Sequence, residues 1–366
     1  MLGVVPSSSP VADAVAARLT RFVERMRTES EEHGPDAAAL IDAAAETLVG
    51  GKRLRARFCH SRLAGDGTVR RSAALEDDVL WDVCAALEIF QSAALVHDDL
   101  IDNSDTRRGR PAAHRALEAT HVANAWDGDA AAFGRSSAVL LGDLLVAWSD
   151  DLLETALDGH PHAATVRREY ARMRREVTTG QFLDIAEESA WSVNPSETHA
   201  ERALRVVSLK SARYSIERPL LLGAALAGAA DDQVAALSGF GHPIGMAFQL
   251  RDDVLGVFGN TEVTGKPAGD DLREGKRTVL IALTREELDA SDRAVLDAQL
   301  GDPALSAEQV TALQEKIVAS GALERVEQMI LDYAAEADAA LRGARLDGDA
   351  IDGLRRLATA ATQRSA

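Results

Sequence analysis

The sequence contains few cysteines and few aromatic residues. Only 2 of its 366 residues are cysteine, Cys59 and Cys84, and they form neither a CxxC pair nor a disulfide framework. We expect both to be reduced thiols, in or near the core of a protein from a reducing compartment. Aromatic residues make up 4% of the chain, and its abundant alanine and leucine favour closely packed helices over a sheet.

A signal peptide, a membrane-spanning run and an excess of positive charge are also absent from the sequence. Residues 1–19 have neither the basic start nor the long apolar run of a secretory signal. The most apolar run, residues 219–230, is too short to cross a bilayer. The 58 acidic and 40 basic residues give a net charge of -18, which disfavours binding to nucleic acid or to an anionic membrane. We therefore expect a cytoplasmic protein with no nucleic-acid partner and no membrane span.

Segments with helical periodicity fill most of the chain, and no run alternates as a strand does. Short breaks rich in glycine, proline, aspartate or serine separate these segments, at residues 65–67, 127–134, 158–161, 191–197, 259–275 and 301–303. None of the breaks resembles a linker between domains. Residues up to about 10 have the composition of a loose tail. We predict a flexible N-terminal tail over residues 1–20 and a single all-α domain over residues 21–366.

The most informative segment, residues 95–111, reads LVHDDLIDNSDTRRGRP. If a helix continues into it, Asp98 and Asp102 stand one turn apart on the same face. A divalent cation between the two carboxylates removes their repulsion, and Mg²⁺ prefers such oxygen ligands together with water and phosphate oxygens. Arg107 and Arg108 follow, and each guanidinium can hold a phosphate through paired hydrogen bonds. The alternative is a solvated acidic helix end followed by a basic turn.

A second acidic pair lies far downstream, in the sequence FQLRDDVLG of residues 248–256. Asp252 and Asp253 are followed by a loop rich in glycine and lysine, TGKPAGDDLREGKRT, at residues 264–278. Two acidic helix ends in one helical protein can face each other across a cavity. Near the N-terminus, a Gly-Gly turn at residues 50–51 presents Lys52, Arg53 and Arg55, a design suited to gripping a phosphate.

Taken together, these segments make the chain similar to the trans-isoprenyl diphosphate synthases of the polyprenyl synthetase family. The resemblance extends from about residue 37 to the end of the chain and is most like the geranylgeranyl diphosphate synthases. Its motifs come in the expected order: GGKRLR at 50–55, the first aspartate motif, RRGRP at 107–111, LLGDLL at 140–145, GQFLD at 180–184, LKSARYS at 209–215, FQLRDD at 248–253 and GKPAGDDLREGK at 265–276.

The resemblance implies a large helical bundle of the isoprenoid synthase type with a central substrate cavity. It also implies a reaction in which an allylic diphosphate ionises, isopentenyl diphosphate attacks the carbocation and a proton is lost. Up to three Mg²⁺ ions are implied, two held by Asp98 and Asp102 and the third by Asp252. A homodimer is expected from the family. The implied catalytic residues are Asp98, Asp102, Asp252, Lys210 and Lys266.

The same resemblance implies two sets of substrate-binding residues. The allylic diphosphate is expected to contact Arg107, Lys210, Ser211, Gln249, Lys266 and Lys276. Isopentenyl diphosphate is expected to contact Lys52, Arg55, Gln91 and Arg108.

Four positions depart from the family pattern. Gly256 stands where many relatives have the third aspartate of the second motif, which puts the affinity of the third metal ion in doubt, although Asp253, Asp270 and Asp271 lie near enough in sequence to help. Gln91 replaces a histidine that is often found there, Ala56 replaces a proline, and Ser211 replaces a threonine but keeps the hydroxyl.

Product length in this family depends on side chains beneath the first aspartate motif. Here these residues are Ala93 and Ala94, which cannot close the pocket as an aromatic ring would. The resemblance therefore favours geranylgeranyl diphosphate, with Phe90, Leu140 and Leu144 as candidates for the lower end of the pocket. The alternatives are a longer-chain polyprenyl diphosphate synthase, a regulatory subunit of a heteromeric synthase and a terpene cyclase. The retained aspartates argue against the regulatory subunit, and the scarcity of aromatic residues argues against the cyclase.

Overall fold

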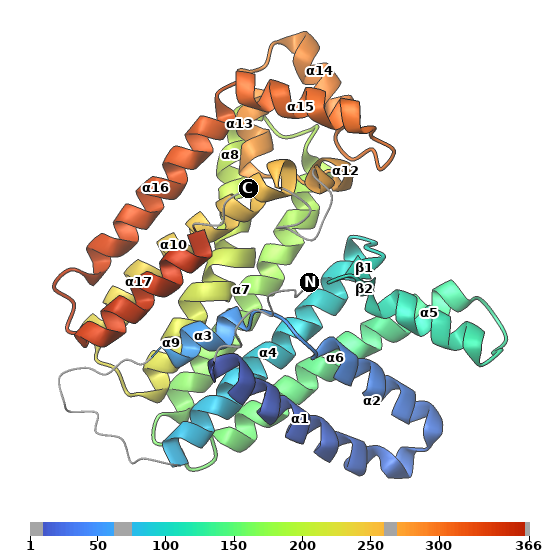
Figure 1. The fold of residues 1–366 in the computed structure, drawn as a ribbon, viewed down its shortest axis with the longest axis vertical. Helices are drawn as coiled ribbons and strands as arrows, with labels where there is room; N and C mark the ends of the chain where they lie inside the picture. The colour runs from blue at the N-terminus through green and yellow to red at the C-terminus, as the bar shows by residue number, and fades with distance from the viewer. Residues whose placement is uncertain (1–9, 62–74, 260–268, 363–366) are drawn as a thin grey trace, which may run out of the picture. The chain divides into compact units, whose positions relative to one another are not determined.

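The computed structural model describes residues 10–61, 75–259 and 269–362. The fold is all-α, as predicted (Figure 1). Within the described residues, the only strands are the two-residue pair β1 (Thr106–Arg107) and β2 (Arg110–Pro111). The described residues form two compact units, one of residues 10–60 and 75–163 and the other of residues 61, 164–259 and 269–362, and each is described by itself.

The first unit is built around two long antiparallel helices, α4 and α6. Their close packing is fixed by small side chains and polar contacts: the hydroxyl of Ser149 on α6 donates to the carbonyl of Ala86 on α4 over 2.5 Å. The His97 ring on α4 lies directly over Gly142 of α6. The helices of this unit are α1 (Pro10–Ser30), η1 (Glu31–His33), α2 (Pro35–Thr47), α3 (Leu54–His60), α4 (Leu75–Ile101), α5 (Ala113–Ala123) and α6 (Ala130–Ala156).

Helix α1 begins at Pro10, so residues 11–20 are helical and the predicted tail was too long. The reason is an apolar stripe at helical spacing, which the prediction overlooked. Val15, Leu19, Phe22 and Val23 lie on one face and are buried. The ring of Phe22 meets that of Trp148 on α6 edge to face, at 5.5 Å between centroids. Burial of this stripe is what holds α1 in the unit.

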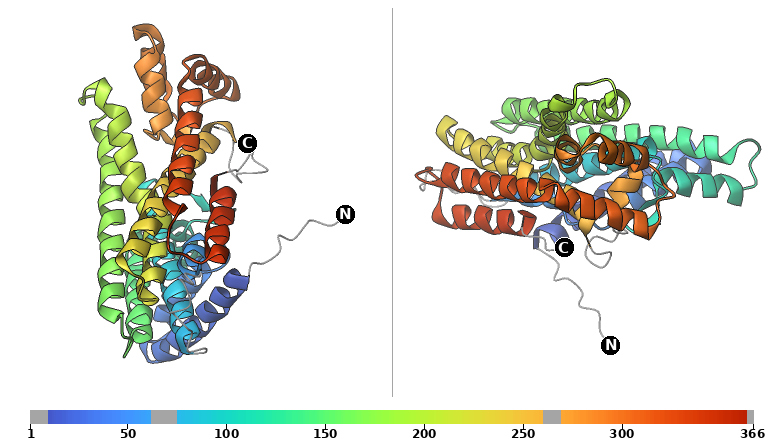
Figure 2. Two further views of the ribbon diagram at one scale, coloured as in Figure 1. Left: turned by 90° about the vertical axis from the view of Figure 1, so that its left-hand side faces the viewer. Right: turned by 90° about the horizontal axis from the view of Figure 1, so that it is seen from above.

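The second unit is arranged around the long helix α10. This helix packs against the segment Val207–Glu217, a π-helix labelled η3, and against α16, which runs side by side with α17 (Figure 2). Its helices are α7 (Ala163–Ala190), η2 (Ser196–Thr198), α8 (His199–Val206), η3 (Val207–Glu217), α9 (Arg218–Leu226), α10 (Asp231–Phe258), α12 (Asp270–Glu274), α13 (Val279–Glu287), α14 (Ala290–Gln299), α15 (Ala307–Ala319), α16 (Ala322–Leu341) and α17 (Gly348–Thr362).

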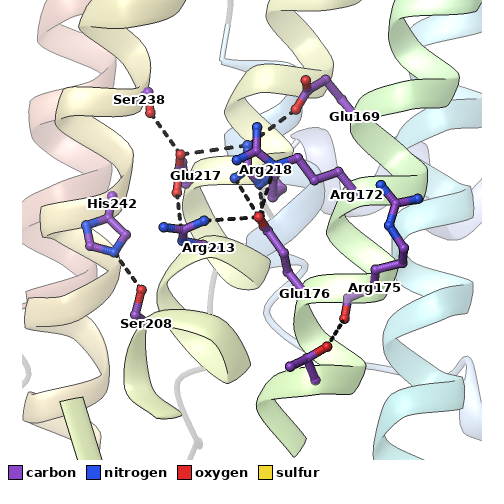
Figure 3. Close-up of polar contacts among 11 residues, drawn as sticks. Glu169, Arg172, Arg175, Glu176, Ser208, Arg213, Glu217, Arg218, Ser238 and His242 are labelled. Atoms are coloured by element: carbon purple, nitrogen blue, oxygen red, sulfur yellow. Dashed lines mark hydrogen bonds and ion pairs between the residues drawn. The ribbon is translucent and has the colours of Figure 1, made fainter. Parts of the chain in front are cut away.

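An ionic network connects η3 to α7 (Figure 3). Arg218, whose side chain is 2% exposed, donates to both carboxylate oxygens of Glu176 over 2.8 and 3.1 Å. Arg213 of η3 donates to the same carboxylate over 3.0 Å. Burial raises the pKa of Glu176, but the arginines outweigh it and hold that pKa below its usual range. A π-helix is rare, and this one is fixed by paired charges on its inner side.

Two helices are long and apolar enough to cross a membrane by length and composition: α4, from residue 78 to 101, and α6, from residue 130 to 156. The sequence analysis considered only the uninterrupted run at 219–230 and so missed them. The core helices of soluble proteins pass the same test. Helix α4 fits that description, since 61% of its most apolar window is buried inside the structure; the share for α6 is 28%. The absence of a membrane span stays a prediction.

The ionic network predicts that replacing Arg218 and replacing Arg172, which both bind Glu176, destabilise the protein to different extents. Arg218→Ala leaves Glu176 partly buried without its bidentate partner, and we expect the free energy of unfolding to fall by about 3 kcal/mol. Arg172 also donates to Glu176, over 3.0 Å, but its side chain is 50% exposed. Arg172→Ala is therefore the matched control, with an expected loss of about 0.5 kcal/mol. Urea denaturation followed by circular dichroism measures both, and equal losses would contradict the assignment of Arg218 as the anchor.

Candidate functional site

The first aspartate motif forms the C-terminal end of α4. The amide of Asp102 donates to the carbonyl of Asp98 over 2.8 Å, so helical geometry continues through the motif. The two residues are one turn apart and share a face of the helix. Gln91 lies two turns before Asp98 on the same face. The structure therefore brings together the two predicted metal ligands of this motif and one predicted diphosphate ligand.

The Asp99 side chain points away from the face shared by Asp98 and Asp102 and has a structural role. It is 3% exposed, and it accepts hydrogen bonds from both Nε and Nη2 of Arg107, with 2.8 Å to Nε. Burial raises the pKa of Asp99, although the Arg107 guanidinium opposes that rise. The same guanidinium lies 3.5 Å from a carboxylate oxygen of Asp98. Asp99 thus holds Arg107 beside the metal-binding face, where its charge is available to a diphosphate.

Arg108, the second arginine of RRGRP, lies in the turn between β1 and β2. Arg108 has a positive φ of 54°, and its Nη1 donates to the carbonyl of Val49 over 3.2 Å. This bond joins the RRGRP hairpin to the Gly-Gly turn. Gly51 has a φ of 92°, a backbone conformation that favours glycine, and a Cβ there would come within 2.8 Å of the Arg108 guanidinium. Two motifs that lie far apart in the sequence therefore form one cationic surface.

The Gly-Gly turn presents two cations, not the three predicted. Arg53 is buried, and its Nη2 donates to the carbonyl of Leu48 over 2.5 Å. Its Nη1 lies 3.5 Å from the buried carboxylate of Glu88 on α4. Arg53 has a left-handed backbone, with a φ of 49°, and its side chain turns inward to Leu48 and Glu88. Lys52 is exposed and Arg55 half-buried, and both remain candidates for diphosphate binding.

Positive charge is concentrated around Arg108. Burial lowers the pKa of its guanidinium, and the neighbouring charge of Arg53 lowers it further, with smaller effects from Arg107 and Arg55. An anion bound here would relieve that repulsion. Such a cluster in a protein with a net charge of -18 is a local anion-binding surface.

A cavity of about 680 Å³ lies in the same unit, between α2, α4, α5 and the β1–β2 hairpin. From α4 it is lined by Ser92, Leu95, Val96 and Asp99. Of these, Ser92, Val96 and Asp99 share a face that is different from the face of Asp98 and Asp102. Arg107 and Arg108 also reach the wall of this cavity, so it adjoins the cationic surface.

In the second unit, the motifs GQFLD and LKSARYS meet where α7 crosses η3. A Cβ at Gly180 would lie within 2.8 Å of the backbone of Leu209 and Lys210, so glycine permits this close approach. The Lys210 ammonium then donates to Asp184 of α7 over 2.5 Å. Ser211 lies next to Lys210 on the π-helix. Asp184 was missed as a functional residue, because its role depends on a partner from another motif.

The second aspartate motif lies near the C-terminal end of α10. Asp253 is 6% exposed and accepts a hydrogen bond over 2.8 Å from Gln249, a predicted diphosphate ligand. Burial raises the pKa of Asp253 to about 8, and the charges of Asp271 and Asp252 add to the rise. Asp252 stays the predicted metal ligand of this motif, since the Asp253 side chain is buried and contacts Gln249.

Two further predicted ligands follow α10. Lys276 lies after α12, 3.0 Å from Glu274. Lys266 lies outside the described residues, so the structure does not place it. Across the parts of the chain that the structure describes, no three His, Cys, Asp or Glu side chains gather into a metal-binding group. Asp98 and Asp102 nevertheless suit Mg²⁺, which is commonly held by one or two carboxylates, with water and phosphate oxygens completing its shell.

The chain is similar to several known proteins. Residues 38–317 match the family described as Polyprenyl synthetase. The chain is 32% identical to geranylgeranyl diphosphate synthase of Sulfolobus acidocaldarius over 62% of each protein, and 34% identical to heptaprenyl diphosphate synthase component 2 of Geobacillus stearothermophilus over 82% of each. A solved geranylgeranyl pyrophosphate synthase of Corynebacterium glutamicum, complexed with isoprenyl diphosphate and magnesium, is 40% identical; the match has a TM-score of 0.89 and covers 96% of this chain and 98% of that one.

Because Arg53 turns inward and Lys52 is exposed, replacing these two neighbouring cations should affect stability differently. Arg53→Gln removes the charge that balances buried Glu88, so we expect a loss of about 3 kcal/mol in the free energy of unfolding. Lys52→Gln changes an exposed side chain, and we expect a change of at most about 0.5 kcal/mol. Urea denaturation of the two variants tests the difference. A larger loss for Lys52→Gln than for Arg53→Gln would reverse the assignment of the two cations.

Proposed function

The chain belongs to the polyprenyl synthetase family, and from this premise we propose that it condenses isopentenyl diphosphate with an allylic diphosphate in a Mg²⁺-dependent reaction. The observation that carries the proposal is the end of α4, where Asp98 and Asp102 share a face and Arg107 is held beside them by buried Asp99. This arrangement binds a cation and a diphosphate together. The regulatory-subunit alternative is disfavoured because every carboxylate of the first motif is present.

Bound Mg²⁺ would stabilise the negative charge that develops on the departing pyrophosphate. Asp98 and Asp102 are proposed to hold two ions and Asp252 a third. No nucleophilic side chain is needed, because the double bond of isopentenyl diphosphate attacks the allylic carbocation and a proton is then lost. The proposed allylic diphosphate ligands are Arg107, Lys210, Ser211, Gln249, Lys266 and Lys276, and those for isopentenyl diphosphate are Lys52, Arg55, Gln91 and Arg108.

Geranylgeranyl diphosphate is the proposed product. Ala94 lies one turn before Asp98 on the same face, where its methyl group leaves room for a growing chain. Ala93 shares a face with His97, whose ring contacts α6, so Ala93 faces α6 and is buried. Leu140 is 61% exposed, which disfavours it as a residue that closes the pocket. Two relatives named geranylgeranyl synthases support the product, against the longer-chain alternative.

A homodimer and a cytoplasmic location complete the proposal. Helix α6 supports the dimer, because only 28% of its most apolar window is buried. Val139 and Leu140 are 44% and 61% exposed on this helix. A second copy of the chain would cover such an apolar face.

The assignment of Asp98 and Asp102 as metal ligands predicts that replacing either one causes a severe loss of activity without unfolding the protein. Asp98→Ala or Asp102→Ala should lower turnover by orders of magnitude, on the order of 10³-fold or more, because each removes charge-balancing oxygen ligands. Asp105→Ala is the matched control, since Asp105 is exposed and pairs with Arg115. Its turnover should stay within about twofold. Product formation is measured by chromatography with mass detection, and circular dichroism checks helical content; near-normal turnover in the Asp98 or Asp102 variant would contradict the assignment.

The positions of Ala93 and Ala94 predict how aromatic replacements act. Ala94→Phe narrows the space beside Asp98, so the main product should shorten from twenty carbons to fifteen. Ala93→Phe should also shorten it, but overpacking against α6 should cost about 1–3 kcal/mol of stability. Product chains are identified after removal of phosphate, and stability is measured by urea denaturation. Unchanged chain length in both variants would place the end of the pocket elsewhere.

A further inference from the structure

Directly after α7, the chain places a buried aromatic ring among cationic side chains. Trp191 is 5% exposed, and the ring of His199, the first residue of α8, stacks on it with 3.8 Å between the ring centroids. The guanidinium carbon of Arg277 lies 5.2 Å from the centre of the Trp191 ring. That of Arg285 on α13 lies 5.8 Å from the same centre. Two cations are therefore held beside one ring in the second unit.

The charges of these two arginines are balanced differently. Nε and Nη2 of Arg285 donate to the carboxylate oxygens of Asp297 over 2.9 and 3.0 Å, and Nη1 donates to the Ser196 hydroxyl over 2.6 Å. In the described part of the chain, the buried Nε and Nη1 atoms of Arg277 donate to no acceptor. Burial lowers the pKa of Arg277; Asp297 and Glu188 oppose that fall, and Arg285 adds to it.

Two more buried donors of this segment have no acceptor among the described residues. They are the indole Nε1 of Trp191 and the amide Nδ2 of Asn194. Indole, amide and guanidinium N–H groups are all donors, so they cannot satisfy one another. Buried donors in native proteins are almost always paired with an acceptor. A water molecule accepts hydrogen bonds but leaves the charge of Arg277 unbalanced.

We propose that Trp191, Asn194 and Arg277 form a binding site for a small oxyanion of the phosphate class. Such an ion supplies several acceptor oxygens together with the negative charge that Arg277 lacks. A guanidinium holds an oxyanion through charge-assisted, paired hydrogen bonds, which are stronger than bonds between neutral groups. The buried position of the indole N–H strengthens its bond to the ion further, because water competes for it less.

This oxyanion site does not use the residues assigned to the two substrate diphosphates. Lys276, the residue before Arg277, is a proposed ligand of the allylic diphosphate and lies 3.0 Å from Glu274. Arg277 lies against Trp191 instead. The two neighbouring cations thus have different contacts, and the inference goes beyond the proposed function.

The fluorescence of Trp191 can report binding of inorganic phosphate. The full-length protein is titrated with phosphate in the absence of Mg²⁺, at an ionic strength kept constant with potassium chloride. We expect a saturable change in tryptophan emission. Trp191→Phe should abolish the change, because the other three tryptophans, Trp81, Trp126 and Trp148, lie in the first unit.

Variants of the proposed ligands give the affinity test. Arg277→Gln removes the charge, and we expect the phosphate concentration for half-maximal change to rise roughly 10-fold or more. Asn194→Ala deletes one donor and should raise it about 5-fold, which keeps the test available if Arg277→Gln does not fold. Arg205→Gln is the matched control and should stay within about twofold, since Arg205 on α8 is 54% exposed and pairs with Glu201. Circular dichroism checks that each variant is folded.

Several outcomes would overturn the oxyanion site. One is a folded wild-type protein whose emission does not change saturably with phosphate, or changes equally with potassium chloride alone. Another is an unchanged affinity in folded Arg277→Gln or in Asn194→Ala. A response that is lost in Arg108→Gln but kept in Arg277→Gln would place the phosphate on the cationic surface around Arg108. Prenyl transfer by a protein that shows any of these results would leave the proposed function standing.

Discussion

Ion pairs in which a buried or partly buried carboxylate holds a cation in place are the interaction on which this structure depends. The chain carries a net charge of -18, yet its proposed ligands are anionic, so its positive groups must be concentrated and oriented locally. In most of the cationic motifs, an arginine or lysine forms an ion pair with a carboxylate of the protein itself. The pairs are Glu88 with Arg53, Asp99 with Arg107, Asp184 with Lys210, and Glu176 with Arg213 and Arg218.

These ion pairs within the protein change the entropy cost of binding a diphosphate. A free lysine or arginine loses rotamer freedom when it contacts a ligand, and that loss reduces affinity. Arg107 and Lys210 are already oriented by Asp99 and Asp184 before any ligand arrives. The partners also share a cation's charge with the ligand, which keeps the pyrophosphate from being held too tightly to leave. Orientation is therefore gained at the expense of some attraction.

The fold class and the order of the motifs could be predicted from the sequence, because both depend on local patterns. Helical periodicity and the i, i+4 spacing of Asp98 and Asp102 need no knowledge of distant residues. The direction of Arg53 could not be predicted, since it depends on a left-handed backbone and on Glu88, 35 positions away in the sequence. The close approach of the Asp271 side chain to Gly256 could not be predicted either, because it depends on how α12 packs against α10.

In both aspartate motifs, the two adjacent carboxylates face different surroundings. In each pair the second residue is rotated by about 100° around the helix from the first, so when one faces a ligand the other faces the packed interior. Asp99 and Asp253 are both buried, and burial raises the pKa of each. Asp99 holds Arg107, and Asp253 accepts from Gln249. The two adjacent carboxylates therefore have different surroundings: Asp98 and Asp252 stay the predicted metal ligands, while Asp99 and Asp253 each contact a predicted diphosphate ligand.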